Sequence, residues 1–188
     1  MKARGATDCD TASSTRARLL EAAVKIVRET GGTRLRLDEV AHRAGVSKGG
    51  LLYHFPSKQS LLSTLVADYV QCMELRIAAA SEAIDDSDDA RALKARIVGL
   101  LGDNGLARWP GAALLVALAN PPLMESIRGH IVSDARHLIA SDAHCARAAV
   151  VALALDGVML REALDVPGFS GEQHQALVDQ LMKLADEA

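Results

Sequence analysis

Apolar residues recur along most of this chain at intervals of three and four, which places them on one face of an α-helix. The pattern predicts helices over residues 16–29, 37–44, 47–54, 57–84, 90–101, 111–119, 121–140, 143–164 and 171–187. Glycines, prolines and short polar stretches separate these segments, as expected at helix ends. No stretch alternates apolar and polar residues well enough to predict a strand. The expected fold is therefore all-α.

The lengths of these helices predict how the chain is divided. Residues 1–14 are small and polar and are expected to form a disordered tail. The helix over residues 57–84 would be about 40 Å long at ~1.5 Å per residue, which is enough to link two domains. We expect a small three-helix domain over residues 15–60 and a larger helical domain over residues 61–188.

Composition supports a helical protein that does not enter a membrane. Hydrophobic residues make up 49% of the 188 residues and aromatic residues only 3%, which favours helices over strands. The longest apolar runs have about eight residues, against the ~20 needed to cross a bilayer. The first ten residues lack the apolar segment of a secretory signal. We expect a soluble, cytoplasmic protein.

Charge is divided unevenly along the chain. Residues 1–65 contain 11 Lys and Arg against 6 Asp and Glu, whereas the remainder contains 10 against 18. A basic N-terminal part on an acidic body suggests that only the N-terminal part meets a polyanion. A solvated basic surface is the alternative, and charge alone does not decide between them.

The cysteines and histidines predict no metal or cofactor site. Cys9, Cys72 and Cys145 are scattered and odd in number, so we expect no disulfide framework. Small core residues and a thiol in the tail are the simple interpretation, and a redox or metal sensor is the alternative. His130 and His137 lie about 10 Å apart on a helix and cannot share one metal.

The segment Leu37 to Phe55, LDEVAHRAGVSKGGLLYHF, predicts two short helices joined by a sharp turn. Gly45 stands at the break, where a left-handed conformation costs glycine little. Ala41 is small enough to let the second helix approach closely. This is the pattern of a helix-turn-helix, whose second helix enters the DNA major groove by its N-terminus. The alternative is a structural helical hairpin that never meets DNA.

The string AGVSKGGLLYHFPSKQSLL resembles the DNA-binding signature of the TetR family of transcription regulators. The resemblance is specific over about Leu19 to Leu65. Farther along, LDGVMLREAL at Leu155 to Leu164 is similar to the penultimate helix of some members. The resemblance implies that residues 15–60 bind DNA and that residues 61–188 form a regulatory and dimerisation domain.

By that resemblance, Lys48 and Gly50 face the groove, Tyr53 and His54 contact phosphates, and Lys58 reaches the DNA backbone. A lysine ammonium and a tyrosine hydroxyl are both donors to phosphate oxygens, so each role is chemically sound. For His54, packing at the helix end is the alternative.

Four further residues complete the predicted DNA-binding surface. Ser47 and Gly49 belong to the small, polar tip of the second helix, and the Ser47 hydroxyl can donate to a phosphate or a base. Arg36 stands where the family often has Thr; it cannot cap a helix but can clamp a phosphate. Leu52 stands where the family often has an aromatic residue and offers only an apolar contact, for example to a thymine methyl. The operator sequence is therefore not predicted.

The last two predicted helices carry broad apolar faces with small residues that permit close approach. Two copies can build a four-helix bundle from them, and the resemblance favours such a homodimer. Burial against the same chain is the alternative. The residues expected at the interface are Ala146, Val150, Leu153, Gly157, Leu160, Leu177, Leu181 and Leu184.

A regulator also needs an input. Flexible apolar side chains mixed with single polar groups suit a pocket for a small-molecule effector, and core packing is the alternative for each of them. The candidates are Met73, Trp109, Leu115, Met124 and His130.

The sequence contains no G-x-S-x-G, P-loop, G-x-G-x-x-G or H-E-x-x-H motif, so we expect no enzyme. The prediction is a sequence-specific regulator, a repressor that binds a palindromic operator as a homodimer and is released by an effector. The alternative is an architectural or adaptor protein that binds DNA without a ligand switch.

Overall fold

The computed structural model describes residues 14–30, 34–86, 88–102, 110–129, 145–164, 166 and 169–186. Throughout these ranges the regular secondary structure is helical and contains no strand. The predicted all-α fold is therefore confirmed. No described helix is both long enough and apolar enough to span a membrane.

The helices agree with the predicted segments to within two residues at each described end. They are α1 (Thr15–Thr30), α2 (Leu37–Ala44), α3 (Lys48–His54), α4 (Lys58–Ala83), α5 (Asp88–Leu101), α6 (Pro110–Leu118), α8 (Cys145–Ala163) and α9 (Gly171–Asp186). Residues 121–129 are also helical, and the rest of the segment predicted over 121–140 lies outside the described residues.

Serine hydroxyls cap several of these helices, as their positions in the sequence predict. Ser14 accepts a hydrogen bond from the Ala17 amide at 3.2 Å, and Ser57 accepts one from the Ser60 amide at 3.0 Å. Ser170 and Gln173 form a reciprocal capping box at the start of α9. Each cap satisfies an amide that has no partner within its own helix.

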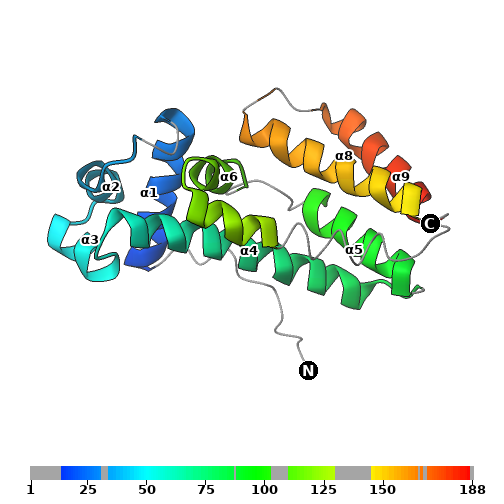
Figure 1. The fold of residues 1–188 in the computed structure, drawn as a ribbon, viewed down its shortest axis with the longest axis horizontal. Coiled ribbons are helices and arrows are strands. Elements are labelled where there is room, and N and C mark those ends of the chain that lie inside the picture. The colour runs from blue at the N-terminus through cyan, green and yellow to red at the C-terminus, as the bar shows by residue number, and fades with distance from the viewer. Residues whose placement is uncertain are drawn as a thin grey trace.

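Helix α4 runs along the length of the molecule and links two cores (Figure 1). The helices α1 to α3 lie at one end, and α5, α8 and α9 lie toward the other, with α6 between them. The N-terminal core joins buried side chains of α1, α2, α3, the first turns of α4, α6 and residues 121–129. The C-terminal core joins α5, α8 and α9, with Met73 and Ile77 of α4 packed against it.

Two expectations about individual residues are corrected. Leu181 is only 3% exposed within the C-terminal core of its own chain, so it does not lie on a free face where a second copy could dock. Apolar spacing identifies a buried face but not the surface that covers it.

Cys72 is disulfide-bonded, which corrects its interpretation as an unpaired core thiol; its partner lies outside the described side chains.

The turn between α2 and α3 fixes the direction of α3. Gly45 adopts φ 64° and ψ 38°, a left-handed conformation that glycine adopts at little cost. Its amide donates to the His42 carbonyl, and the Val46 amide donates to the Ala41 carbonyl. Arg18 of α1 donates to the Ala44 carbonyl and, at 3.4 Å, to the Gly45 carbonyl. The turn is therefore tied to the rest of the three-helix unit.

Helix α3 also approaches the turn too closely for any side chain at Gly50. A Cβ built there would lie 2.8 Å from Cγ1 of Val46 and 3.3 Å from Oγ of Ser47. Ser47 itself caps α3 by accepting from the Gly50 amide at 3.0 Å. At the neighbouring Gly49, a Cβ would meet no atom closer than 4.0 Å.

The two glycines should therefore respond oppositely to alanine. We expect Gly49→Ala to leave the free energy of unfolding unchanged or raise it by up to about 1 kcal/mol, because alanine favours a helix. We expect Gly50→Ala to lower it by about 1 kcal/mol or more, because overpacking costs ~1–3 kcal/mol and β-branched Val46 cannot rotate away cheaply. Urea unfolding of both variants measures the difference; equal effects would contradict the close approach.

Candidate nucleic-acid interface

Helix α3 buries one face and exposes the other. Leu51 and, just after the helix, Phe55 are buried in the N-terminal core. On the opposite face, Leu52 is 38% exposed and Tyr53 is 85% exposed. His54 is half-buried, with its ring 5.2 Å from that of Tyr53 in an edge-on contact. An aromatic ring left this open to solvent is available to contact another molecule.

The leading end of α3 is its N-terminal end, Ser47 to Gly50, and it consists of small and polar residues. Lys48 and Gly49 are exposed, and Gly50 is half-buried beneath them. Because the Ser47 oxygen already accepts the capping hydrogen bond, its hydroxyl proton remains to be donated to a phosphate or a base. Together with Leu52, Tyr53 and His54, these residues form the outer face of α3 and the end that precedes it.

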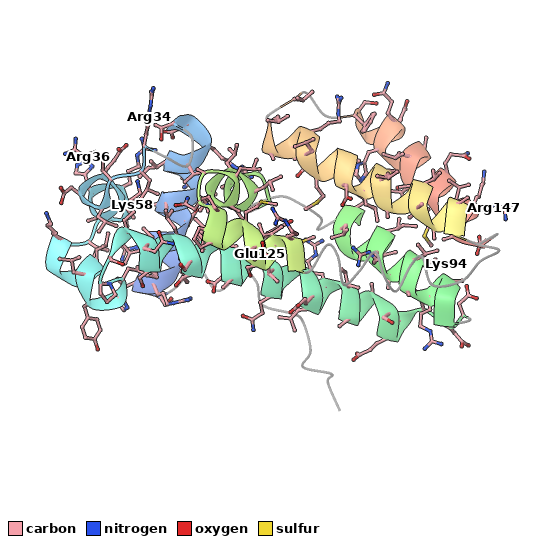
Figure 2. All side chains as sticks on the ribbon, in the orientation of Figure 1. Arg34, Arg36, Lys58, Lys94, Glu125 and Arg147 are labelled. Atoms are coloured by element: carbon pink, nitrogen blue, oxygen red, sulfur yellow. The ribbon has the colours of Figure 1, made fainter. Side chains whose placement is uncertain are left out.

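Two arginines precede α2 and point away from the helices. Figure 2 shows Arg34 and Arg36 projecting from the end of the molecule that α1 to α3 form. The backbone of Arg36 is extended, and its side chain makes no capping hydrogen bond to α2, as expected for an arginine in that position. Leu35, between them, is buried. Sequence reasoning missed Arg34, although the alternation of two arginines around a leucine is the signal that could have found it.

Lys58 begins α4 and is half-buried at the base of the same unit. The structure thus brings the nine predicted DNA-binding residues to one end of the molecule. Their individual contacts with DNA remain predictions.

Several cations of the N-terminal unit are held in ion pairs. Arg43 lies 2.6 Å from Glu29 and 2.9 Å from Glu39, and its hydrogen bond lowers the pKa of Glu29. Lys48 lies 2.9 Å from Asp38, and its hydrogen bond lowers the pKa of Asp38. The excess of positive charge in residues 1–65 is therefore partly engaged within the chain.

Arg16 connects α1 to both neighbouring helices. Its guanidinium pairs with Asp68 of α4 at 3.2 Å and lies 5.9 Å from the centre of the Phe55 ring. These contacts fix the end of α3 against α1 and the first half of α4. Arg16 is thus a structural residue rather than a member of the outer face of α3.

The predicted effector-pocket residues do not gather around one core. Met73 packs half-buried against the C-terminal core, whereas Leu115 and Met124 pack against the N-terminal core. Trp109 and His130 lie outside the described residues. The pocket remains a prediction, and among the described residues no three His, Cys, Asp or Glu side chains gather as a metal site.

An exposed apolar stripe runs along α8. Leu153 is 70% exposed, and Val150 and Leu160 are also exposed. Ala146 is exposed, and no described atom lies within 4 Å of a Cβ built at Gly157. On α9, by contrast, Leu177 and Leu184 are half-buried against the C-terminal core. Of the two predicted apolar faces, only that of α8 is left largely uncovered.

Two family models match this chain, one over each part. The model of bacterial regulatory proteins of the tetR family matches residues 19–65, which include α2, α3 and the start of α4. A model of a tetracyclin repressor-like C-terminal domain matches residues 90–186. The second match alone covers more than half of the chain.

Relatives with known names are transcriptional regulators. The HTH-type transcriptional regulator BetI of Pectobacterium carotovorum is 26% identical over 171 residues, covering 84% of this chain and 87% of that protein. The HTH-type transcriptional regulator TtgR of Pseudomonas putida is 35% identical over 77 residues, or 41% of this chain. That match spans only 36% of TtgR, about a third of its length.

Solved structures share the fold over most of the chain. A TetR-like transcriptional regulator from Rhodococcus sp. RHA1 is 23% identical with a TM-score of 0.65, covering 92% of this chain and 94% of that one. The TetR family regulator PfmR from Thermus thermophilus is 18% identical with a TM-score of 0.62, covering 92% and 96%. With family matches over both parts and a helix-turn-helix that exposes its second helix, this chain belongs to the tetR family of bacterial regulatory proteins and is a DNA-binding transcriptional regulator.

Proposed function

We propose that this regulator is a repressor that binds a palindromic operator as a homodimer and that a small-molecule effector releases it. The observation that carries the proposal is the outer face of α3, where Tyr53 is 85% exposed beside Leu52 while the inner face is fixed in the core. We also propose a cytoplasmic location, because the protein has to reach DNA.

The outer face of α3 offers the chemistry that a major groove needs. Lys48 and the Ser47 hydroxyl supply donors to base or phosphate acceptors, and Leu52 supplies an apolar contact to a thymine methyl. Tyr53 and His54 at the other end of the helix, with Arg36 and Lys58, reach the phosphates on either side. Gly49 and Gly50 keep the leading end narrow, so that the backbone can approach the bases.

We assign the dimer interface to α8. Ala146, Val150, Leu153, Gly157 and Leu160 follow one another at alternating intervals of four and three, the spacing of a seam between packed helices. A twofold axis would set this stripe against its copy in the partner. Leu177 and Leu184 of α9 are half-buried and remain in the proposed interface, whereas Leu181 is excluded because its own chain buries it.

Effector release requires a connection between the body and the three-helix unit. Helix α6 supplies one, because Ala112, Ala113, Val116 and Ala117 are fully buried in the N-terminal core with α1 and the start of α4. A ligand held near Leu115 and Met124 would therefore bias the contact on which α1 rests. In the proposed mechanism this shifts the population toward a dimer whose two α3 helices are wrongly spaced.

The DNA-binding proposal is tested with two lysines. We select duplexes from random DNA, map the protected site, and measure affinity at about 150 mM salt. Lys48→Ala should weaken binding by about 1–3 kcal/mol, the scale of a good specific contact. Lys25→Ala, which removes an α1 cation paired with Glu21, is the matched control and should change affinity much less. Equal effects of the two variants would remove Lys48 from the interface.

The dimer proposal is tested with two exposed leucines. Leu153→Glu places an unpaired charge in the proposed seam, which costs several kcal/mol when buried. Sedimentation should then show monomer or aggregate, with operator affinity falling sharply. Leu75→Glu changes an exposed leucine of α4 and should leave the dimer intact. A wild-type dimer for Leu153→Glu would place the interface elsewhere.

Effector release is tested with the single tryptophan, Trp109. Candidate apolar small molecules that change its fluorescence should release operator DNA over the same concentration range, because ligand and DNA affinities are reciprocally linked. Suppose that a ligand releases DNA while Trp109 emission stays constant and Trp109→Phe responds normally. The pocket would then lie nearer Met73, Met124 or His130. DNA binding that no ligand changes and that shows little sequence preference would favour an architectural or adaptor protein.

A further inference from the structure

The ion pair between Lys48 and Asp38 joins the first turns of two helices at the leading end of α3. Nζ of Lys48 lies 2.9 Å from Oδ1 of Asp38, and the two side chains remain 65% and 60% exposed. Lys48 is the first residue of α3, and Asp38 is the second residue of α2. The pair thus lies open to solvent where the proposed function brings DNA.

We infer that Asp38 is an internal counterion that DNA must displace from Lys48, and that it weakens the binding of every DNA sequence by this regulator. The inference rests on the proposed function, since it concerns the same outer face of α3. A carboxylate oxygen within hydrogen-bond distance of Lys48 occupies the place that a phosphate oxygen or a base acceptor would take. It also leaves a negative charge beside the DNA backbone once the pair is broken.

The fold does not need this pair. The orientation of α2 and α3 is set by the left-handed Gly45, the hydrogen bonds from Arg18 and the contact of Gly50 with Val46. None of these contacts involves Asp38 or Lys48. Exposed ion pairs also contribute little to stability, so the main consequence of the pair falls on what Lys48 can bind.

The other ion pairs of the unit differ in what they join. Arg43 lies between Glu29 of α1 and Glu39 of α2, and Arg16 ties α1 to Asp68 of α4. Arg43 thus links α2 to α1 and Arg16 links α1 to α4, and none of these three pairs includes a residue of α3. The hydrogen bond from Lys48 also lowers the pKa of Asp38, so the carboxylate remains charged through the neutral range and persists as a counterion there.

The experiment compares two carboxylates in the same helical turn. Asp38→Asn and Glu39→Gln each remove one negative charge from the first turn of α2, but Glu39 pairs with Arg43 rather than with Lys48. Affinity is measured for a selected operator duplex and an unrelated duplex of equal length at about 50 mM salt, with and without Lys48→Met. Thermal unfolding confirms that each variant folds, and Asp38→Ser replaces Asp38→Asn if that variant does not.

We expect Asp38→Asn to raise the affinity for both duplexes about two- to five-fold, the scale of an exposed ion pair. This gain in affinity should be larger than the gain that Glu39→Gln produces. This excess should disappear in the Lys48→Met background. A gain no larger than that of Glu39→Gln, or one that persists without Lys48, overturns the inference. So does a loss confined to the operator, which would mean that Asp38 accepts a hydrogen bond from a base. An unmutated chain that binds neither duplex overturns the proposed function as well.

Discussion

The left-handed turn at Gly45 is the constraint on which the helix-turn-helix end of this molecule depends. Helix α3 has only seven residues, and a helix of that length is not stable alone in water. Its direction comes from the turn, from Arg18, which holds the turn to α1, and from the close contact of Gly50 with Val46. Once these are fixed, Leu51 and Phe55 face the core and Leu52 and Tyr53 must face outward. The packing of the buried face of α3 therefore determines which of its residues are exposed.

The same core extends past the three-helix unit, and this extension makes the fold suited to regulation. The first turns of α4 and the buried alanines of α6 pack together with α1. The three-helix unit of α1 to α3 is therefore attached to the rest of the chain by α6 as well as by α4. A second core of α5, α8 and α9 lies farther along α4. A rearrangement that moved α6 relative to this second core would therefore also change the packing around α1. The division of the chain expected between residues 60 and 61 lies within the N-terminal core, where Leu61 and Leu62 are buried with Leu19 and Leu20.

Local signals explain why so much of the fold and the site could be predicted. The positions of Gly45 and Ser47, and the capping box of Ser170 and Gln173, depend on residues at most a few positions apart, and the structure contains all of them. Contacts between distant segments could not be predicted in this way. Leu181 has the spacing of an interface residue, but only the arrangement of α5 and α8 around it reveals that its own chain covers it. The pairing of Lys48 with Asp38 likewise depends on the angle between two helices, which neither residue determines.

The distribution of charge shows how such a non-local contact changes a conclusion from composition. Residues 1–65 carry an excess of five positive charges, which suggests a strong general attraction to DNA. In the structure, Arg16, Arg43 and Lys48 each face a carboxylate, and Arg18 is engaged by two backbone carbonyls. Long-range attraction depends on the net charge and is unchanged by these pairs, but close contact with phosphates depends on the cations that can leave their partners. Arg34 and Arg36 project from the end of the molecule (Figure 2), although Arg36 also lies near enough to Asp38 to help lower the pKa of that carboxylate. The composition therefore describes the approach to DNA, whereas the ion pairs determine which cations are available once the surfaces meet.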